Sequence, residues 1–236
     1  MRGFVVMAMF LASFADAAWN DYTSVRELEL NADGIEAFTI DAGAGSIDIK
    51  GVEGLDKLMV VATVVVADLD EEDAIKFIDR KMQLSLDKAG NRARLVSDFE
   101  EGFFGNGPGA RIDLEISMPT GIAIEVDDGS GSIDIVGVIA DVSIDDGSGS
   151  IEVRGVANVL IDDGSGSIDI AAASGDVSIV DGSGSIEVRS VGGSVTIDDG
   201  SGSIKVSDVE QDLIIVDDGS GGFSYSDVRG AVEEDS

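Results

Sequence analysis

The sequence predicts an all-β protein built as a β-solenoid, a β-helix-like stack of two-strand coils of about 18 residues, with a small α+β insertion that contains one short helix. Two observations lead to this fold class. The string Asp-Gly-Ser-Gly recurs at intervals of 18, 17, 18, 18 and 19 residues. Short stretches in which apolar and polar residues alternate lie before and after each of these strings, as in half-buried β-strands. The first glycines of the string are Gly129, Gly147, Gly164, Gly182, Gly200 and Gly219.

A third observation is that aliphatic residues recur at five fixed places in every repeat. One such ladder consists of Ile133, Ile151, Ile168, Ile186, Ile204 and Phe223. A single repeat of this length cannot bury its apolar face, whereas stacked neighbours can. The alternative is a run of antiparallel hairpins, because Asp-Gly is also a hairpin-turn signal. Hairpins would not require the same residue at the same place in every repeat, so the pattern favours stacked coils.

Residues 1–17 have the features of a secretory signal peptide. Arg2 supplies a positive charge, residues 4–14 form an apolar stretch, and Ala15 and Ala17 are small residues at a cleavage site. The main alternatives are a core strand and a membrane anchor, but the stretch is shorter than the roughly 20 residues that span a bilayer. We therefore predict a protein that is extracytoplasmic, either periplasmic or secreted, and not inserted in the membrane after cleavage.

The remaining chain, residues 18–236, is predicted to form a single β-solenoid domain. A first coil is expected at about 35–52, the α+β insertion at about 53–111, and the repeat array at about 112–230. The insertion should contain a helix over residues 71–81, because Asp70 can cap it and acidic residues begin it. A strand–turn–strand segment should follow over residues 83–99, and the helix is placed to cover the open end of the stack.

Phe103 and Phe104 lie in a glycine-rich loop within the insertion. If they are exposed they form a contact patch for a partner, and otherwise they fold back onto the core.

Composition excludes several classes of function. The chain has 15 Lys and Arg against 47 Asp and Glu, a formal net charge of −32, which repels nucleic acid. It has no Cys and no His, which excludes disulfides, thiol nucleophiles and histidine-based catalytic triads.

The most repeated polar residue is the Asp before each turn glycine, and it is the only candidate metal ligand. One interpretation is calcium binding, because calcium prefers carboxylate and carbonyl oxygens. The other is turn formation, because Asp readily bonds to its own backbone in such turns. The repeat departs from the calcium-binding nonapeptide, so turn formation is favoured and calcium stays the alternative. The residues concerned are Asp128, Asp146, Asp163, Asp181, Asp199 and Asp218.

A second row of acids follows the turns, at Asp134, Glu152, Asp169 and Glu187, and ends at Lys205. Paired carboxylates can hydrolyse glycosides. These acids repeat from coil to coil, however, whereas a catalytic pair is a local exception. We therefore expect a solvated face, no catalytic residues and no enzymatic activity.

The segment from Arg111 to Val138 combines an alternating strand, Pro119-Thr120-Gly121 and the first Gly-Ser-Ile strand. In these features the chain resembles, from about residue 25 to 230, the bacterial putative-adhesin family, a β-solenoid domain of unknown function in envelope proteins. The resemblance implies an extracytoplasmic, non-enzymatic protein. Together with the composition and the repeat, it leads us to expect an acidic scaffold or adhesin-like surface protein that contacts a protein or glycan at the cell envelope. A calcium-stabilised interaction module is the alternative function.

Overall fold

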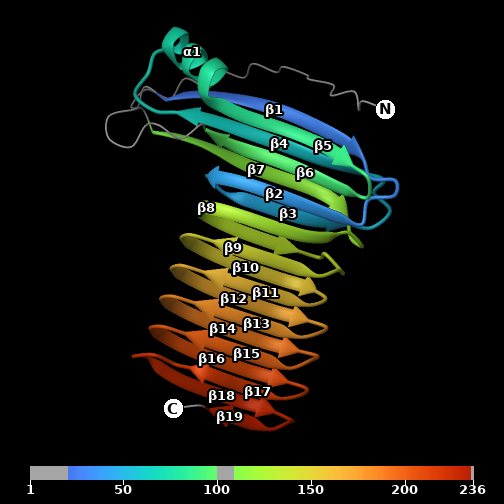
Figure 1. Cartoon of the computed structure of the whole chain (residues 1–236), viewed down its shortest axis with the longest axis vertical. Coiled ribbons are helices and arrows are strands. Elements are labelled where there is room, and N and C mark those ends of the chain that lie inside the picture. Colours follow the sequence, from blue (N-terminus) through green and yellow to red (C-terminus); the bar gives the residue numbers. More distant parts are fainter. Residues whose placement is uncertain (1–20, 100–108, 235–236) are drawn as a thin grey trace.

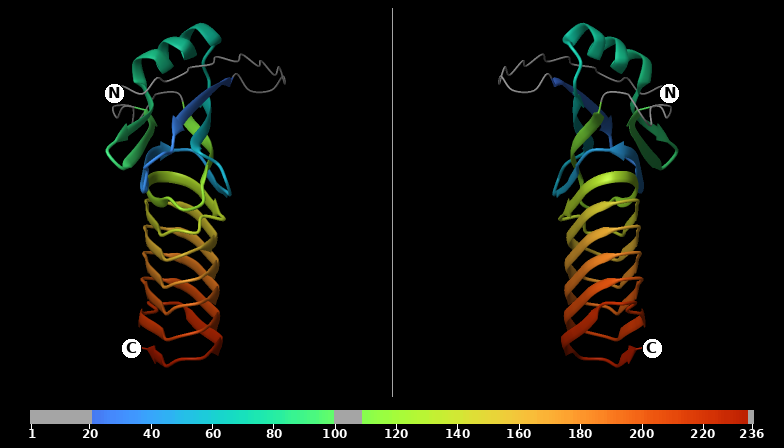
Figure 2. Two further views of the ribbon diagram at one scale, coloured as in Figure 1. Left: turned by 90° about the vertical axis from the view of Figure 1, so that its right-hand side faces the viewer. Right: turned by 90° about the vertical axis from the view of Figure 1, so that its left-hand side faces the viewer.

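The computed structural model describes residues 21–99 and 109–234. The predicted signal peptide, Phe103 and Phe104 lie outside the described residues. The chain forms a long stack of strands in two sheets that face each other across one core (Figures 1 and 2). We call the sheets A and B; within the repeat array each coil contributes one strand to each sheet.

The repeat array begins with β8 (Ala123–Val136), whose first half lies in sheet B and whose second half lies in sheet A. Sheet B continues with β9 (Val142–Asp146), β11 (Val159–Asp163), β13 (Val177–Asp181), β15 (Val195–Asp199), β17 (Leu213–Asp217) and β19 (Val232–Glu234). Sheet A continues with β10 (Gly149–Val156), β12 (Gly166–Ala173), β14 (Gly184–Val191), β16 (Gly202–Val209) and β18 (Gly222–Val228).

Equivalent strands of successive coils pair in parallel and in register. Ile151 lies beside Ile168 in sheet A, and Ile161 lies beside Ile179 in sheet B. This pairing confirms the predicted β-solenoid, because antiparallel hairpins would place different repeat positions side by side. The predicted aliphatic ladders point inward, and Ile133, Ile151 and Ile168 are each only 1% exposed.

Above the array, β2 (Ala37–Ala44) and β3 (Ile47–Val52) form a coil that pairs with both halves of β8. Sheet A then continues through β7 (Ala110–Pro119), β4 (Lys57–Val66) and β1 (Tyr22–Asn31), with the last three strands antiparallel. Sheet B continues through the hairpin β6 (Arg92–Phe99) and β5 (Met82–Ala89). The array is therefore parallel, whereas the outermost strands of the N-terminal part pair antiparallel.

The one helix of the described chain, α1 (Glu71–Lys81), has the predicted bounds and lies at the β1 and β5 end of the stack (Figure 1). Asp70 caps it, since its Oδ1 accepts a hydrogen bond of 3.0 Å from the backbone N–H of Asp73. Ala74 and Ile78 are buried, and Phe77 stacks on Phe99 of β6 with ring centroids 5.5 Å apart. Within the described residues, no helix is long and apolar enough to cross a membrane.

Replacing Asp70 with Ala should lower the free energy of unfolding by about 1 kcal/mol, because the N–H of Asp73 loses its side-chain acceptor. Asp79→Ala, an exposed change on the same helix, is the control and should alter it by less than about 0.5 kcal/mol. Urea denaturation followed by circular dichroism measures both. Equal effects of the two substitutions would show that the cap does not stabilise α1.

Candidate functional site

The Asp-Gly-Ser-Gly turns stack along one edge of the array and are hydrogen-bonded to one another. The N–H of Gly164 donates to the carbonyl of Asp146 in the preceding coil, at 2.9 Å. The N–H of Gly166 donates to the carbonyl of Ser183 in the following coil, also at 2.9 Å. The turns are thus joined by backbone hydrogen bonds in both directions along the stack, which brings their backbones close together.

This close approach explains the second glycine of each turn. Gly149, Gly166 and Gly184 have φ values of +155°, +153° and +157°. A Cβ atom at any of these three positions would lie 1.5 Å from the carbonyl oxygen of the corresponding glycine in the preceding coil. Only glycine both adopts this conformation and leaves room for the neighbouring turn.

The Asp before each turn is not a surface residue. In the alternation Val142, Ile144, Asp146, the Asp falls on the inward phase and lies beside the core. Five of these carboxyl groups are 0–3% exposed and form one column along the turn edge. We call this column the buried aspartate ladder; its members are Asp128, Asp146, Asp163, Asp181 and Asp199.

One oxygen of the carboxyl group makes the predicted turn contact. Oδ1 of Asp163 accepts a hydrogen bond of 3.1 Å from the backbone N–H of Ser165. Asp146, Asp181 and Asp199 make the same bond to the residue two positions on, at 3.1–3.2 Å. The other oxygen, Oδ2, is buried without a hydrogen-bond partner in these four residues, and in Asp128 neither oxygen has one.

Burial raises the pKa of all five carboxyl groups. It raises the pKa of Asp128 to about 7, with the negative charge of Asp146 adding to the effect. It raises the pKa of Asp146 and of Asp181 to about 6. It also raises the pKa of Asp163 and of Asp199. The acids that raise these pKa values further are ladder neighbours and the aspartates beside them in the turns.

The two ends of the ladder differ from its middle. Asp218 occupies the equivalent place in the last turn but is only half-buried. At the other end the first coil has Ala42 beside Asp128, and Ser97 of β6 lies beside Ala42. Ser97 is 2% exposed, and its hydroxyl also has no partner.

The six candidate ligand positions therefore lie in one row, one per coil, rather than in a cluster. Among residues 21–99 and 109–234, no three or more Asp and Glu side chains converge on a point where they could hold a metal ion. The row was predicted from the sequence, but its burial was not. The signal was present in the sequence, because each Asp continues the period-2 phase of two inward aliphatic residues.

The outward acids of sheet A align as predicted, and basic residues neutralise much of the row. Arg189 lies 3.0 Å from Asp169, and Lys205 lies 2.9 Å from Glu187, which lowers the pKa of Glu187. Arg154 pairs with Glu152. This face is a network of exposed ion pairs.

The array face of sheet B has a different character. Its odd-numbered strands, from β9 to β19, contain no Lys or Arg. Asp127, Asp145 and Asp162 form an exposed acidic row along it. Four exposed aliphatic residues lie on the same strands: Leu160 at 53%, Val180 at 45%, Val216 at 43% and Val232 at 36%. The protein thus presents one ion-paired face and one uncompensated acidic face.

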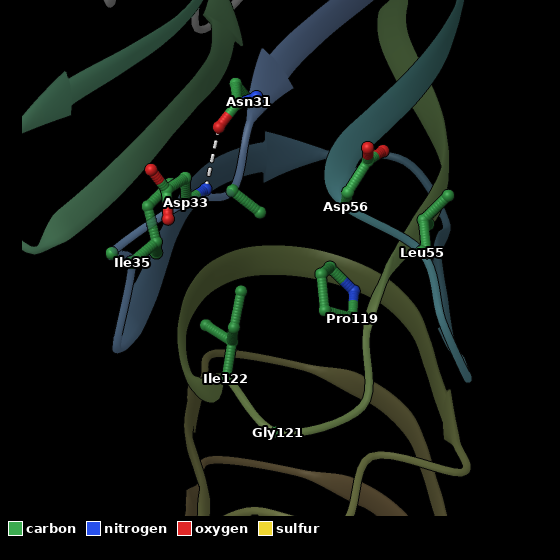
Figure 3. Close-up of a pocket in the computed structure, with 10 residues that line it drawn as sticks. Asn31, Asp33, Ile35, Leu55, Asp56, Pro119, Gly121 and Ile122 are labelled. Carbon is green, nitrogen blue, oxygen red and sulfur yellow. Dashed lines mark hydrogen bonds between the residues drawn. The ribbon is translucent and has the colours of Figure 1, made fainter.

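A pocket of about 590 Å³ lies where the N-terminal part meets the array (Figure 3). Its walls come from the loops 31–35, 55–56 and 119–122. Ile35 and Ile122 are buried and supply apolar wall, while the exposed Asp33 and Asp56 contribute carboxyl groups. Asn31 fixes the first loop, because its Oδ1 accepts a hydrogen bond of 2.8 Å from the N–H of Asp33.

Comparisons with known proteins bear on the fold. No family model matches the chain, and no curated protein matches its sequence. A solved structure of a putative adhesin from Bacteroides fragilis is similar, with a TM-score of 0.50 and 16% identity over 91% of this chain and 97% of that one. The sequence-based resemblance to bacterial putative adhesins is thereby confirmed at the level of the fold.

Two further solved structures have lower TM-scores. One is a putative cell adhesion protein from Clostridium sporogenes, with a TM-score of 0.38 and 10% identity over 92% of this chain and all (100%) of that one. The other is a putative lipid binding protein from Parabacteroides distasonis, with a TM-score of 0.39 and 14% identity over 92% and 97% of the two chains.

Replacing Gly166 with Ala should destabilise the protein by more than about 2 kcal/mol. The positive φ of this position is strained for alanine, and the new Cβ atom would collide with the backbone of the neighbouring turn. Gly121→Ala is the control, since Gly121 has open space around its Cβ position. It should change stability by less than about 1 kcal/mol. Urea unfolding of both variants measures the difference. A Gly166→Ala protein as stable as the control would show that the turns are not closely stacked.

Proposed function

We propose that the protein is a non-enzymatic, extracytoplasmic scaffold, secreted or periplasmic, that acts like an adhesin by holding a protein or glycan at the cell envelope. One observation carries this proposal. Most polar side chains of the array repeat from coil to coil in aligned rows along the stack. Such rows build an extended surface of constant chemistry, which suits a scaffold.

The arrangement of the acids supports the non-enzymatic part of the proposal. A hydrolytic site needs two carboxyl groups in different environments at one place on the substrate. Here the outward acids of sheet A repeat at one strand spacing and are paired with Arg189 and Lys205. The inward acids are buried beside the core, where no substrate can reach them.

Two surfaces are suited to contact with a partner. The acidic face of sheet B is long, flat and uncompensated, and Leu160 and Val180 add exposed apolar area to it. The pocket between Ile35 and Ile122 offers a recess for a single side chain or sugar at the junction with the N-terminal part. The neighbours named as adhesins support this reading through their fold, which is shared at 16% identity.

Export can be tested by expressing the full chain with a C-terminal tag and fractionating the cells. The expected product lies outside the cytoplasm and begins at Ala18, because small residues at positions 15 and 17 direct cleavage. A variant carrying Ala15→Leu and Ala17→Leu is the control and should retain its N-terminal segment. Intact mass spectrometry measures both. A cytoplasmic product that begins at Met1 would contradict the proposed location.

Binding can be tested by adding the purified protein, without residues 1–17, to envelope preparations and measuring what sediments with them. Pretreatment of the envelopes with protease or with glycosidases separates a protein partner from a glycan partner. We expect one of the two treatments to abolish binding. Absence of binding to untreated envelopes would contradict the adhesin-like role.

A calcium-stabilised interaction module is the second candidate, favoured by the unpartnered Oδ2 atoms of the buried aspartate ladder. Thermal melts in EDTA, in millimolar CaCl₂ and in MgCl₂, at matched ionic strength, distinguish the calcium-stabilised module from the metal-free scaffold. For the scaffold we expect equal melting temperatures, because each ladder position offers at most two free oxygens whereas calcium takes about 6–8. A rise specific to calcium would establish the second candidate in its place.

A further inference from the structure

We infer that the buried aspartate ladder is a proton-binding site, in which carboxyl groups protonated by the solvent bond from coil to coil and make the stack most stable in mildly acidic surroundings. These five residues have no part in the proposed contact with a partner. Their protonation therefore stands or falls independently of the adhesin-like function.

The first support is the hydrogen bonding of the carboxyl groups. In Asp146, Asp163, Asp181 and Asp199, Oδ1 already accepts a turn N–H, and Oδ2 is buried without a partner. A charged oxygen in such a place is strongly disfavoured unless it is paired. A proton on Oδ2 removes the charge and converts the atom from an unsatisfied acceptor into a donor.

The second support is the position of a suitable acceptor. Asp146 lies directly beside Asp128 and Asp163 in the parallel register of sheet B. Adjacent strands are about 4.8 Å apart, so the carboxyl group of the next coil lies one strand spacing away and is available as an acceptor for a protonated carboxyl group. Four of the five coils offer one free carboxyl oxygen each, and that of Asp128 offers two. Such a column suits protons, each of which is shared by one donor and one acceptor atom, better than it suits a calcium ion, which takes about 6–8 oxygen ligands.

The third support is the charge around the ladder. From sheet B the nearest charged groups are the partly or fully exposed acids Asp127, Asp145, Asp162 and Asp198, which precede four of the ladder members, and Asp217 of the last turn. Asp181 is preceded by Val180 instead, and the charges that act on it are its ladder neighbours Asp163 and Asp199. At the C-terminal end Asp218 is a further negative neighbour of Asp199. From sheet A the inward residues are aliphatic, such as Ile151 and Ile168, and Arg154, Arg189 and Lys205 lie on its outer face. Only the turn N–H groups favour the charged form.

The direction in which stability changes with pH follows from the raised pKa values of the ladder carboxyl groups. Asp128 has a pKa of about 7 and Asp146 and Asp181 of about 6, whereas an Asp in the unfolded chain titrates near 3.9. The pKa values of these carboxyl groups are higher in the folded protein than in the unfolded chain. Protonation of the ladder therefore stabilises the fold fully at a pH below the unfolded pKa, and this stabilisation is lost as the pH rises through the folded pKa values. Stability should therefore fall between about pH 4 and pH 8.

The test compares two triple variants that remove the same formal charge. Asp146→Asn/Asp163→Asn/Asp181→Asn neutralises the middle of the ladder, while Asn keeps an acceptor for the turn N–H and adds a donor. Asp145→Asn/Asp162→Asn/Asp198→Asn neutralises the partly or fully exposed acids of the same turns. Melting temperatures are measured from pH 5 to pH 8 in EDTA, so that bound calcium makes no contribution.

We expect the melting temperature of the unaltered protein to fall as the pH rises from 5 to 8. The ladder triple should melt about 5 °C or more above it at pH 8 and should lose most of this pH dependence. The control triple should keep the pH dependence. If both triples behave alike, net charge rather than the ladder explains the effect and the inference is overturned.

A direct measurement keeps the inference testable if the ladder triple does not fold. Carboxyl ¹³C resonances of aspartate-labelled, unaltered protein are followed by NMR during a pH titration. We expect resonances that titrate at about pH 6–7, assigned to the ladder by their absence from single variants such as Asp146→Asn. Titration of every aspartate below about pH 5 would overturn the inference.

Discussion

The structure depends above all on the parallel, in-register pairing of each coil with the next. This pairing places equivalent repeat positions one strand spacing apart, so a residue that recurs in the repeat forms a continuous row along the stack. It makes the aliphatic ladders into a continuous core, and it forces the turn backbones so close together that Gly149, Gly166 and Gly184 have no room for a side chain. It also brings the inward aspartates into one buried column.

The same in-register pairing gives the outer faces of the two sheets different charge patterns. The outward face of sheet A carries basic as well as acidic residues, so Asp169 pairs with Arg189 and Glu187 pairs with Lys205, each on a neighbouring strand. In sheet B such pairs lie only toward the N-terminal part, where Glu125 pairs with Arg92 and Asp41 with Arg94. The sheet B strands from β9 onward contain no Lys or Arg, and the negative charge there is left for solvent or for another molecule. The coils are nearly identical, whereas the junction of the N-terminal part with the array brings together loops of different sequence, and that is where the pocket lies.

Sequence reasoning predicted the repeat-derived parts of the fold well, because periodicity reports directly on stacking. The coil register, the helix over residues 71–81 and its cap at Asp70 are all present. It expected the aspartates to be turn formers and did not place them in the core, since Asp is rarely buried and the turn reading already accounted for it. The antiparallel pairing of β1 with β4 was also missed, because residues 22–31 and 57–66 carry no repeat that identifies their partners.

The central claim is that one repeat makes one coil, and the absence of Cys in the chain allows it to be measured by a pair of introduced spin labels. Ser132 and Ser203 are exposed on the outer face of sheet A and are linked through the register of β8, β10, β12, β14 and β16. Four strand spacings place their backbones about 19 Å apart. Double electron–electron resonance on the Ser132→Cys/Ser203→Cys protein should give a narrow distribution near that distance. A distribution centred near about 38 Å, as two strands per repeat in one sheet would produce, would contradict the stacked-coil architecture.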